Sequence, residues 1–153
     1  QALDLLGRKA MMHDGAALNL LMAKIAQTCI EAGADESLKA HADQLATAAK
    51  LAIDATRAAG KRMAAGDVRL ALANASHYMT ALGHLTIGWL WLQQATIAQQ
   101  ALPNAAGDDR DFYAGKLQAC RFFFATELPL VEYHARLVRD AEASAFDMQI
   151  EWF

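Results

Sequence analysis

The sequence predicts an all-α protein, arranged as an antiparallel up-and-down four-helix bundle. Alanine is abundant, only two prolines occur in the 153 residues, and apolar residues recur every three or four positions over long stretches. A chain of this length forms one domain and buries about two-thirds of its unfolded surface in a single core. Four long helices joined by short connections are expected to pack as an up-and-down bundle.

The first two helices are predicted over Gly15–Ala32 and from Asp35 to about Ala65. Asp14 and Asp35 are expected as N-caps, and Gly33 as the stop between the helices. The apolar face of the first helix is expected to comprise Leu18, Leu21, Met22, Ile25 and Cys29. The inward stripe of the second is expected to comprise Leu38, Ala42, Leu45, Ala49, Ala52, Thr56, Ala59 and Met63. Because this stripe is mostly alanine, a neighbouring helix can approach it closely.

The third helix is predicted from Asp67, after the stop at Gly66, to about Leu102. Its main inward stripe is expected to comprise Leu72, Ala75, Met79, Leu82, Leu90 and Ile97, although apolar residues surround the helix. A fourth helix begins after Asp109. Pro129 should kink or split it, since proline lacks an amide donor and clashes with the carbonyl four residues earlier. Helix then continues over Leu130–Ala143, and Phe146–Phe153 is expected to be an irregular tail.

Charge and composition exclude several classes of protein. The formal charge of −3, with acids and bases interspersed, gives no basic surface for nucleic acid. No apolar run approaches the roughly 20 residues of a transmembrane segment. Cys29 and Cys120 lie inside apolar helical patterns, so we expect reduced, buried thiols in a cytoplasmic protein rather than nucleophiles or a disulfide.

Few polar residues form a recognisable chemical site. His77 and His84 share a helix face but lie about 10 Å apart, too far for one ion without outside ligands, so no metal site is predicted. We expect His13 and His41 to be solvated. No glycine-rich loop for phosphate is present. Glu127 and Glu132 flank Pro129, and a solvated corner is favoured there over an acid and base pair.

The first nine residues, Q-A-L-D-L-L-G-R-K, resemble a stretch in bacterial acyl-CoA dehydrogenases with an extended C-terminus. There the stretch closely follows a Tyr-Glu-Gly-Thr segment that lies beside the flavin and, in many members, supplies the catalytic glutamate. Weaker similarities to the extra C-terminal domain of these enzymes follow in the same order. They are His77-Tyr78-Met79 with Gly88-Trp89-Leu90, the run Asp111-Phe112-Tyr113-Ala114-Gly115-Lys116, Arg121-Phe122-Phe123, and Leu128-Pro129.

The resemblance implies a C-terminal piece of a flavoenzyme. Residues 1–14 would continue from the dehydrogenase body, and residues 15–153 would be the helical bundle domain. The parent would oxidise an acyl-CoA to the 2-enoyl-CoA with FAD as hydride acceptor and a glutamate as base. In this piece we expect no catalytic, cofactor-binding or metal-binding residue. Arg8 and Lys9 either reach a nucleotide phosphate or, as we favour, form a surface salt bridge.

Five aromatic residues are predicted to form an interface. Three consecutive phenylalanines span about 200° of helical arc, and two tryptophans two residues apart point in nearly opposite directions, so they cannot all face one core. The predicted interface residues are Trp89, Trp91, Phe122, Phe123 and Phe124. The partner is expected to be the catalytic domains of the same parent chain or a second copy in a homo-oligomer.

Two other kinds of function remain open from the sequence. One is a free-standing helical interaction module without enzymatic activity. The other is a four-helix bundle that binds a metal or another ligand.

Overall fold

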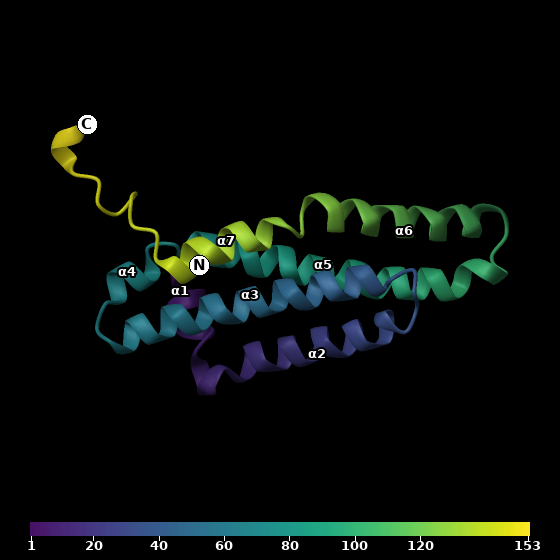
Figure 1. The fold of residues 1–153 in the computed structure, drawn as a ribbon, viewed down its shortest axis with the longest axis horizontal. Coiled ribbons are helices and arrows are strands. Elements are labelled where there is room, and N and C mark those ends of the chain that lie inside the picture. Colours follow the sequence, from purple (N-terminus) through teal and green to yellow (C-terminus); the bar gives the residue numbers. More distant parts are fainter.

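The computed structural model describes residues 1–153, and its regular structure is entirely helical, with no strand (Figure 1). This confirms the predicted all-α class. The long helices are α2 (Ala16–Gly33), α3 (Lys39–Ala64), α5 (Ala75–Ala101), α6 (Gly107–Thr126) and α7 (Leu130–Asp140). The short elements are α1 (Ala2–Asp4), η1 (Leu5–Lys9), η2 (Met12–Gly15), α4 (Val68–Leu72), η3 (Leu102–Asn104) and η4 (Ile150–Trp152). None of the helices combines the length and the apolar character needed to cross a membrane.

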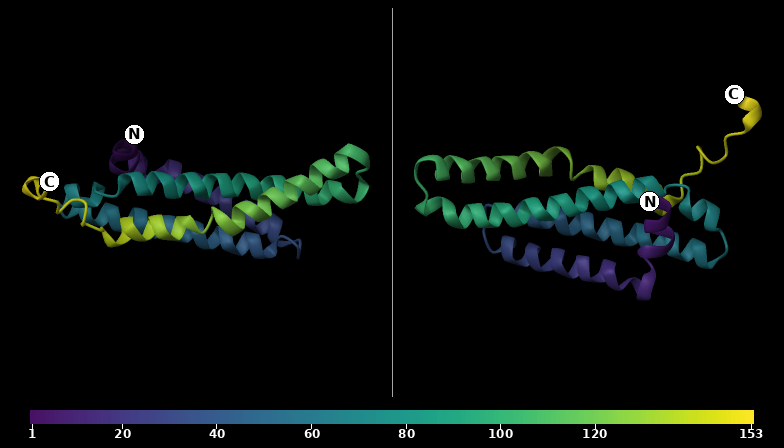
Figure 2. Two further views of the ribbon diagram at one scale, coloured as in Figure 1. Left: turned by 90° about the horizontal axis from the view of Figure 1, so that it is seen from above. Right: turned by 180° about the vertical axis from the view of Figure 1, so that it is seen from behind.

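The long helices lie lengthwise beside one another, and α3 and α5 are the central pair (Figures 1 and 2). Helix α3 packs against α2, α5 and α7, whereas α5 packs against α2, α3, α6 and α7. The N-terminal elements α1 and η1 also pack against α5. After α7 the chain leaves the body of the molecule, and the tail ends in the turn η4 (Figure 1).

The start of α2 is close to the predicted position, but the predicted cap is wrong. His13, Asp14 and Gly15 all have positive φ, at 50°, 56° and 77°, and no side chain caps the helix. Gly15 is the N-cap, because glycine adopts this left-handed conformation without a steric penalty. An N-cap aspartate needs extended backbone angles to reach the helix amides, and the left-handed turn removes that option for Asp14.

The predicted inward stripe of α3 is confirmed, since all of its residues except Met63 are buried. The helix begins at Lys39, later than predicted, because Asp35 closes a turn instead of capping the helix. The Asp35 carboxylate accepts hydrogen bonds from the backbone amide of Ser37 at 2.8 Å and from its hydroxyl at 2.6 Å. The Asp35 carbonyl oxygen then accepts a hydrogen bond from the Lys39 amide at 3.0 Å.

The third predicted helix is broken into α4 and α5, and half of its predicted stripe is wrong. Ala75 is buried, and Leu72 and Leu82 pack against the core, but the other three residues do not face inward. Asn74, buried at the break, donates from its side-chain amide to the Glu142 carbonyl oxygen at 2.8 Å. Met79, Leu90 and Ile97 are 41%, 44% and 62% exposed. The residues of α5 that face inward are Ala75, Tyr78, Ala81, Leu85, Gly88, Leu92, Ala95 and Ala98. Because α5 is apolar on every side, the spacing of its apolar residues does not indicate which side is buried.

Two aromatic residues of α5 are tied to threonines of neighbouring helices. The Tyr78 hydroxyl lies 2.8 Å from Thr56 Oγ1 of α3, and Trp89 Nε1 donates to Thr28 Oγ1 of α2 at 2.8 Å. Each threonine hydroxyl donates to the carbonyl oxygen four residues earlier in its own helix. The threonine oxygens therefore act as acceptors, and the Tyr78 hydroxyl is the donor of its bond.

The predicted break at Pro129 is confirmed, since α6 ends at Thr126 and α7 begins at Leu130. Leu128, only 3% exposed, packs from this elbow onto α5 at Gly88. A Cβ atom placed on Gly88 would lie 2.9 Å from Leu128 Cδ1, closer than real contacts of this kind. The elbow therefore sits where α5 has no side chain. Helix α7 ends at Asp140, earlier than predicted, and the tail is irregular apart from η4.

Enlarging Gly88 should destabilise the fold, whereas enlarging Gly83 should not. We expect Gly88→Val to lower the free energy of unfolding by about 1–3 kcal/mol, because the new methyl groups meet Leu128 in a packed core. A Cβ on Gly83 meets nothing within 4 Å, so Gly83→Ala should raise this free energy by about 0.5–1 kcal/mol through helix propensity. Urea unfolding followed by circular dichroism measures both. A Gly88→Val variant as stable as the parent sequence would contradict the close approach.

The hydrogen bond between Tyr78 and Thr56 should be measurable as a coupling energy. We expect Tyr78→Phe to cost about 1–2 kcal/mol of unfolding free energy, because a buried bond between α3 and α5 is lost. The double variant Tyr78→Phe with Thr56→Val should cost less than the sum of the single changes, by at least about 0.5 kcal/mol. Additive costs in this double-mutant cycle would mean that the two hydroxyls do not interact.

Candidate functional site

The structure divides the five aromatic residues predicted to form an interface. Phe124 is 1% exposed and belongs to the core, whereas Phe122 on the same helix is 60% exposed. Trp89, Trp91 and Phe123 are partly buried and pack against the core. The geometric expectation that some of these side chains face away from the core therefore holds for Phe122. Phe124 is the one that faces the core, where it is buried with residues of α3 and α5, so it is not available for an interface.

Trp91 is engaged within the chain by a lysine that joins α5 to α6. The ammonium of Lys116 lies 5.4 Å from the centre of the Trp91 ring and 5.3 Å from that of Phe112. The same ammonium donates to the side-chain oxygen of Gln94 at 3.0 Å. Cation–π contacts of this kind hold two helices together at a partly exposed site. Trp91 is therefore partly buried within the chain.

Three histidines gather where α5 meets α7, and the sequence indicated only two of them. His134 of α7 lies beside His77, with the two Nδ1 atoms 2.8 Å apart, and its ring centre lies 6.1 Å from that of His84. In the short contact one Nδ1 must carry the proton and the other must accept it. No group of three or more histidine, cysteine, aspartate or glutamate side chains is arranged to hold a metal ion.

His84 connects α5 to the elbow between α6 and α7. Its Nδ1 lies 2.9 Å from the Thr80 carbonyl oxygen, and its Nε2 lies 3.4 Å from the Glu127 carboxylate. Both partners are hydrogen-bond acceptors. Glu127 therefore pairs with histidine, while Glu132 lines a groove beside α3. Burial, and then the neighbouring His77 and His84, lower the pKa of His134.

The expectation that His41 is solvated is wrong. Its ring packs edge-on against Phe124, with 4.9 Å between ring centres, and its Nδ1 is buried without a hydrogen-bond partner. Burial, followed by the nearby Arg121, lowers the pKa of His41. The neutral ring is accordingly favoured, because a charge there is both desolvated and repelled.

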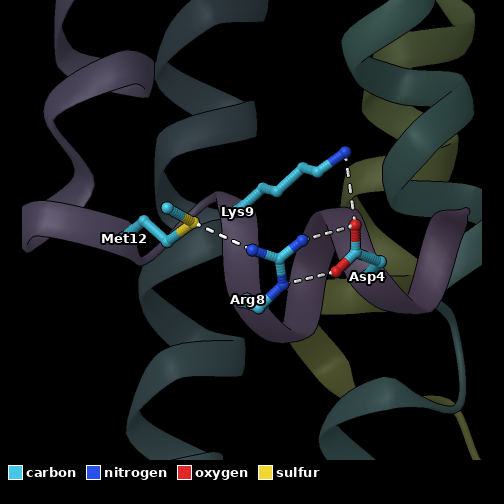
Figure 3. Close-up of polar contacts among 4 residues, drawn as sticks. All are labelled: Asp4, Arg8, Lys9 and Met12. Carbon is cyan, nitrogen blue, oxygen red and sulfur yellow. Dashed lines mark hydrogen bonds and ion pairs between the residues drawn. The ribbon is translucent and has the colours of Figure 1, made fainter.

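Arg8 and Lys9 both bind a carboxylate within their own segment (Figure 3). The Arg8 guanidinium donates to the two Asp4 oxygens at 2.7 and 3.1 Å, and Lys9 Nζ lies 3.2 Å from one of them. The remaining Arg8 amino group lies 3.3 Å from Met12 Sδ. The hydrogen bonds that Arg8 donates are the largest cause of the lowered pKa of Asp4. This arrangement is the surface salt bridge that the sequence favoured over a phosphate contact.

Two grooves lie close to the residues considered above. One, of about 320 Å³, lies between α3 and the elbow, with Phe124, Leu128 and Val131 as its apolar part and Asp43 and Glu132 as its acids. The other, of about 410 Å³, lies beside the left-handed turn before α2 and includes Arg57. Neither groove contains the histidines described above.

Comparison with known proteins gives two similarities. The family model described as acetyl-CoA dehydrogenase C-terminal like matches residues 21–149. A broad-specificity linear acyl-CoA dehydrogenase of Mycobacterium tuberculosis is 44% identical over 55 residues, which is 35% of this chain and 9% of that enzyme. The aligned part is therefore a small share of the length of that curated relative.

The two free thiols should differ in reactivity. Burial raises the pKa of Cys120 to about 11, and burial with nearby Asp43 also raises that of half-buried Cys29. We expect a disulfide reagent to modify Cys29 first and Cys120 only on unfolding or as the pH approaches 11, since only the thiolate reacts.

The shifted pKa also has a consequence for stability. The Cys120 proton stabilises the fold fully below the ordinary thiol pKa, and this contribution is lost as the pH rises toward 11.

A Cys29→Ser variant isolates the slow thiol for measurement of its modification rate. Rapid modification of Cys120 in the folded chain would contradict its burial.

Proposed function

The chain belongs to the acetyl-CoA dehydrogenase C-terminal-like family, and on this premise we propose that it is the C-terminal helical domain of a flavin-dependent acyl-CoA dehydrogenase. The family match over residues 21–149 carries the proposal. Identity to the mycobacterial dehydrogenase supports it. In this proposal residues 1–14 continue from the dehydrogenase body and residues 15–153 form the domain, which includes the whole of the matched range.

We propose that the domain is an antiparallel up-and-down four-helix bundle. Its members would be α2, α3, α5, and α6 with α7 as one bent helix. The lengthwise packing in Figures 1 and 2 and the contacts of α3 with α2, α5 and α7 support this arrangement. The short connection between α2 and α3 is also of the kind that joins antiparallel neighbours.

The proposed parent oxidises an acyl-CoA to the 2-enoyl-CoA, with the α-proton taken by a glutamate and the hydride by FAD. Neither the Arg8–Lys9 pair nor the groove at the elbow fits a flavin site. Arg8 and Lys9, the basic pair nearest to a phosphate-binding role, are held by Asp4. The groove at the elbow carries Asp43 and Glu132 but no cation to bind a diphosphate. We therefore assign the chain no catalytic, cofactor-binding or metal-binding residue.

The role proposed for the chain is structural, namely packing on the catalytic body or oligomerising it in a cytoplasmic enzyme. Exposed Phe122 and the partly buried Trp89, Trp91 and Phe123 remain candidates for that interface. Phe124 is excluded from these candidates, because its side chain is buried in the core. Family membership argues against the free-standing interaction module.

A purified chain of residues 1–153 should bind neither FAD nor an acyl-CoA tightly and should not reduce a dye in the presence of either. The reason is that every group assigned to that chemistry lies in the body of the proposed parent. Flavin absorbance after gel filtration, calorimetry with octanoyl-CoA and a dye-reduction assay measure these properties.

The parent enzyme is the positive control for all three measurements. Its gene should encode a flavoenzyme body upstream of Gln1. A yellow or dye-reducing chain, or a gene without such a body, would overturn the proposed function.

A further inference from the structure

Helix α5 is the one long helix without a charged side chain. Its 27 residues include no aspartate, glutamate, lysine or arginine, whereas α2, α3, α6 and α7 all present charged residues to solvent. A helix at the surface of a globular protein normally carries charged or polar residues on the side that faces water. The exposed side of α5 therefore has the composition of a covered surface.

That exposed side runs along the whole helix. Its exposed positions are Ser76, Met79, Gly83, Ile87, Leu90, Ile97 and Gln100. The four large apolar members are between 41% and 62% exposed. We call the surface formed by Met79, Gly83, Ile87, Leu90 and Ile97 the uncharged face of α5.

The spacing within the uncharged face is suited to a partner helix. Gly83, Leu90 and Ile97 recur at seven-residue intervals, the repeat by which one helix packs along another. A Cβ on Gly83 would meet nothing within 4 Å, so the backbone is accessible there. A neighbouring helix can consequently approach α5 closely at this position.

The area of the face argues against a second copy as its partner. Met79 and Ile97 are 18 residues apart, so the face is about 27 Å long and, at the width of one helix, on the order of 300 Å². A stable complex of free proteins buries about 800 Å² on each partner. A partner on the same polypeptide needs less area, because tethering raises its effective concentration to about the millimolar range.

The N-terminal segment lies where such a tethered partner would enter. Elements α1 and η1 pack against α5, and Leu6 is buried in one cluster with Ala75 and Tyr78 of the first turn of α5. Both views in Figure 2 place the N-terminus beside the first turns of α5. A polypeptide that continues upstream of Gln1 therefore starts at the first turns of α5, the end of the helix at which the uncharged face begins with Met79.

We propose that the uncharged face of α5 is the surface on which the catalytic body upstream of Gln1 docks, through an apolar, uncharged helix of that body. The inference rests on the proposed function and adds the docking face to it. It adds the exposed side of α5 to the candidate interface and removes Trp89 and Trp91 from it, while Phe122 stays exposed. Trp89 is bonded to Thr28 and Trp91 is covered by Lys116, so neither presents a large free surface.

The test compares cysteine labelling in the parent enzyme and in the isolated chain. Leu90→Cys and Ile97→Cys report on the uncharged face, and Lys61→Cys on the exposed side of α3 is the matched control. Peptide-resolved mass spectrometry separates these sites from Cys29 and Cys120. We expect similar rates at all three sites in the isolated chain. In the parent, the labelling rates of the cysteines at positions 90 and 97 should fall about tenfold, because a body that is docked for about nine-tenths of the time leaves them accessible for only one-tenth. The rate at position 61 should change little.

A charge placed on the face should release the body. In the parent, adding Leu90→Asp to Ile97→Cys should restore fast labelling, because docking would bury an unpaired carboxylate. Ile30→Asp, at a 70% exposed position of α2, should leave labelling slow. Both changes are at exposed positions, so the fold of the chain itself tolerates them.

Three results would overturn the inference. Unchanged labelling at 90 and 97 in a parent that does contain a flavoenzyme body would leave the proposed function standing and the docking face wrong. Slow labelling of the isolated chain, with a doubled mass in light scattering, would mean that the partner at this face is a second copy of the chain. A gene without a flavoenzyme body would remove the proposed function itself.

Discussion

The small residues on the inward sides of α3 and α5 are the feature on which the remaining packing depends. The inward side of α3 is mostly alanine, and that of α5 alternates alanine or glycine with a few large residues. Such surfaces let helix axes approach toward the short end of the usual 8–10 Å range. The large side chains of the core come both from this pair, as Leu45, Leu85 and Leu92, and from the surrounding helices. Ile25 of α2, Phe124 of α6 and Val131 of α7 are buried in the same cluster.

The same feature explains how the core accommodates polar groups and a bent helix. Between close backbones there is little room for a buried polar side chain, and Thr56 and Thr28 are small enough to accept a bond from an aromatic donor of α5. Because Gly88 has no side chain, Leu128 of the elbow can pack directly against the backbone of α5. Pro129 ends one hydrogen-bonded ladder there, and the bend lets α6 follow α5 while α7 packs on both α3 and α5.

A central helix of this kind carries apolar residues on several sides for different reasons. Leu85 and Leu92 are fully buried, Trp89 and Trp91 pack toward α2 and α6, and the exposed side is equally free of charge. The buried leucines and the two tryptophans pack against other parts of the chain. The exposed side of α5 has no such neighbour, and this difference is the reason for placing a docking surface there rather than at Trp89 and Trp91. The histidines at the α5–α7 contact bond mainly to each other, to a backbone carbonyl and to Glu127.

The sequence alone determined the helical class, the inward face of α3, the break at Pro129 and the family resemblance in the first nine residues. Each of these depends on residues that are close together in the sequence. The inward face of α3 follows from the spacing of alanine in a helix otherwise rich in charge, and the break follows from the missing amide of Pro129. Only the tertiary structure decided which side of α5 is buried, because a helix apolar all round has no periodic signal. It likewise decided the left-handed turn that displaces Asp14, and the placement of His134 beside His77 and of Phe124 in the core. Those positions depend on which helices meet, and residues far apart in the chain specify that jointly.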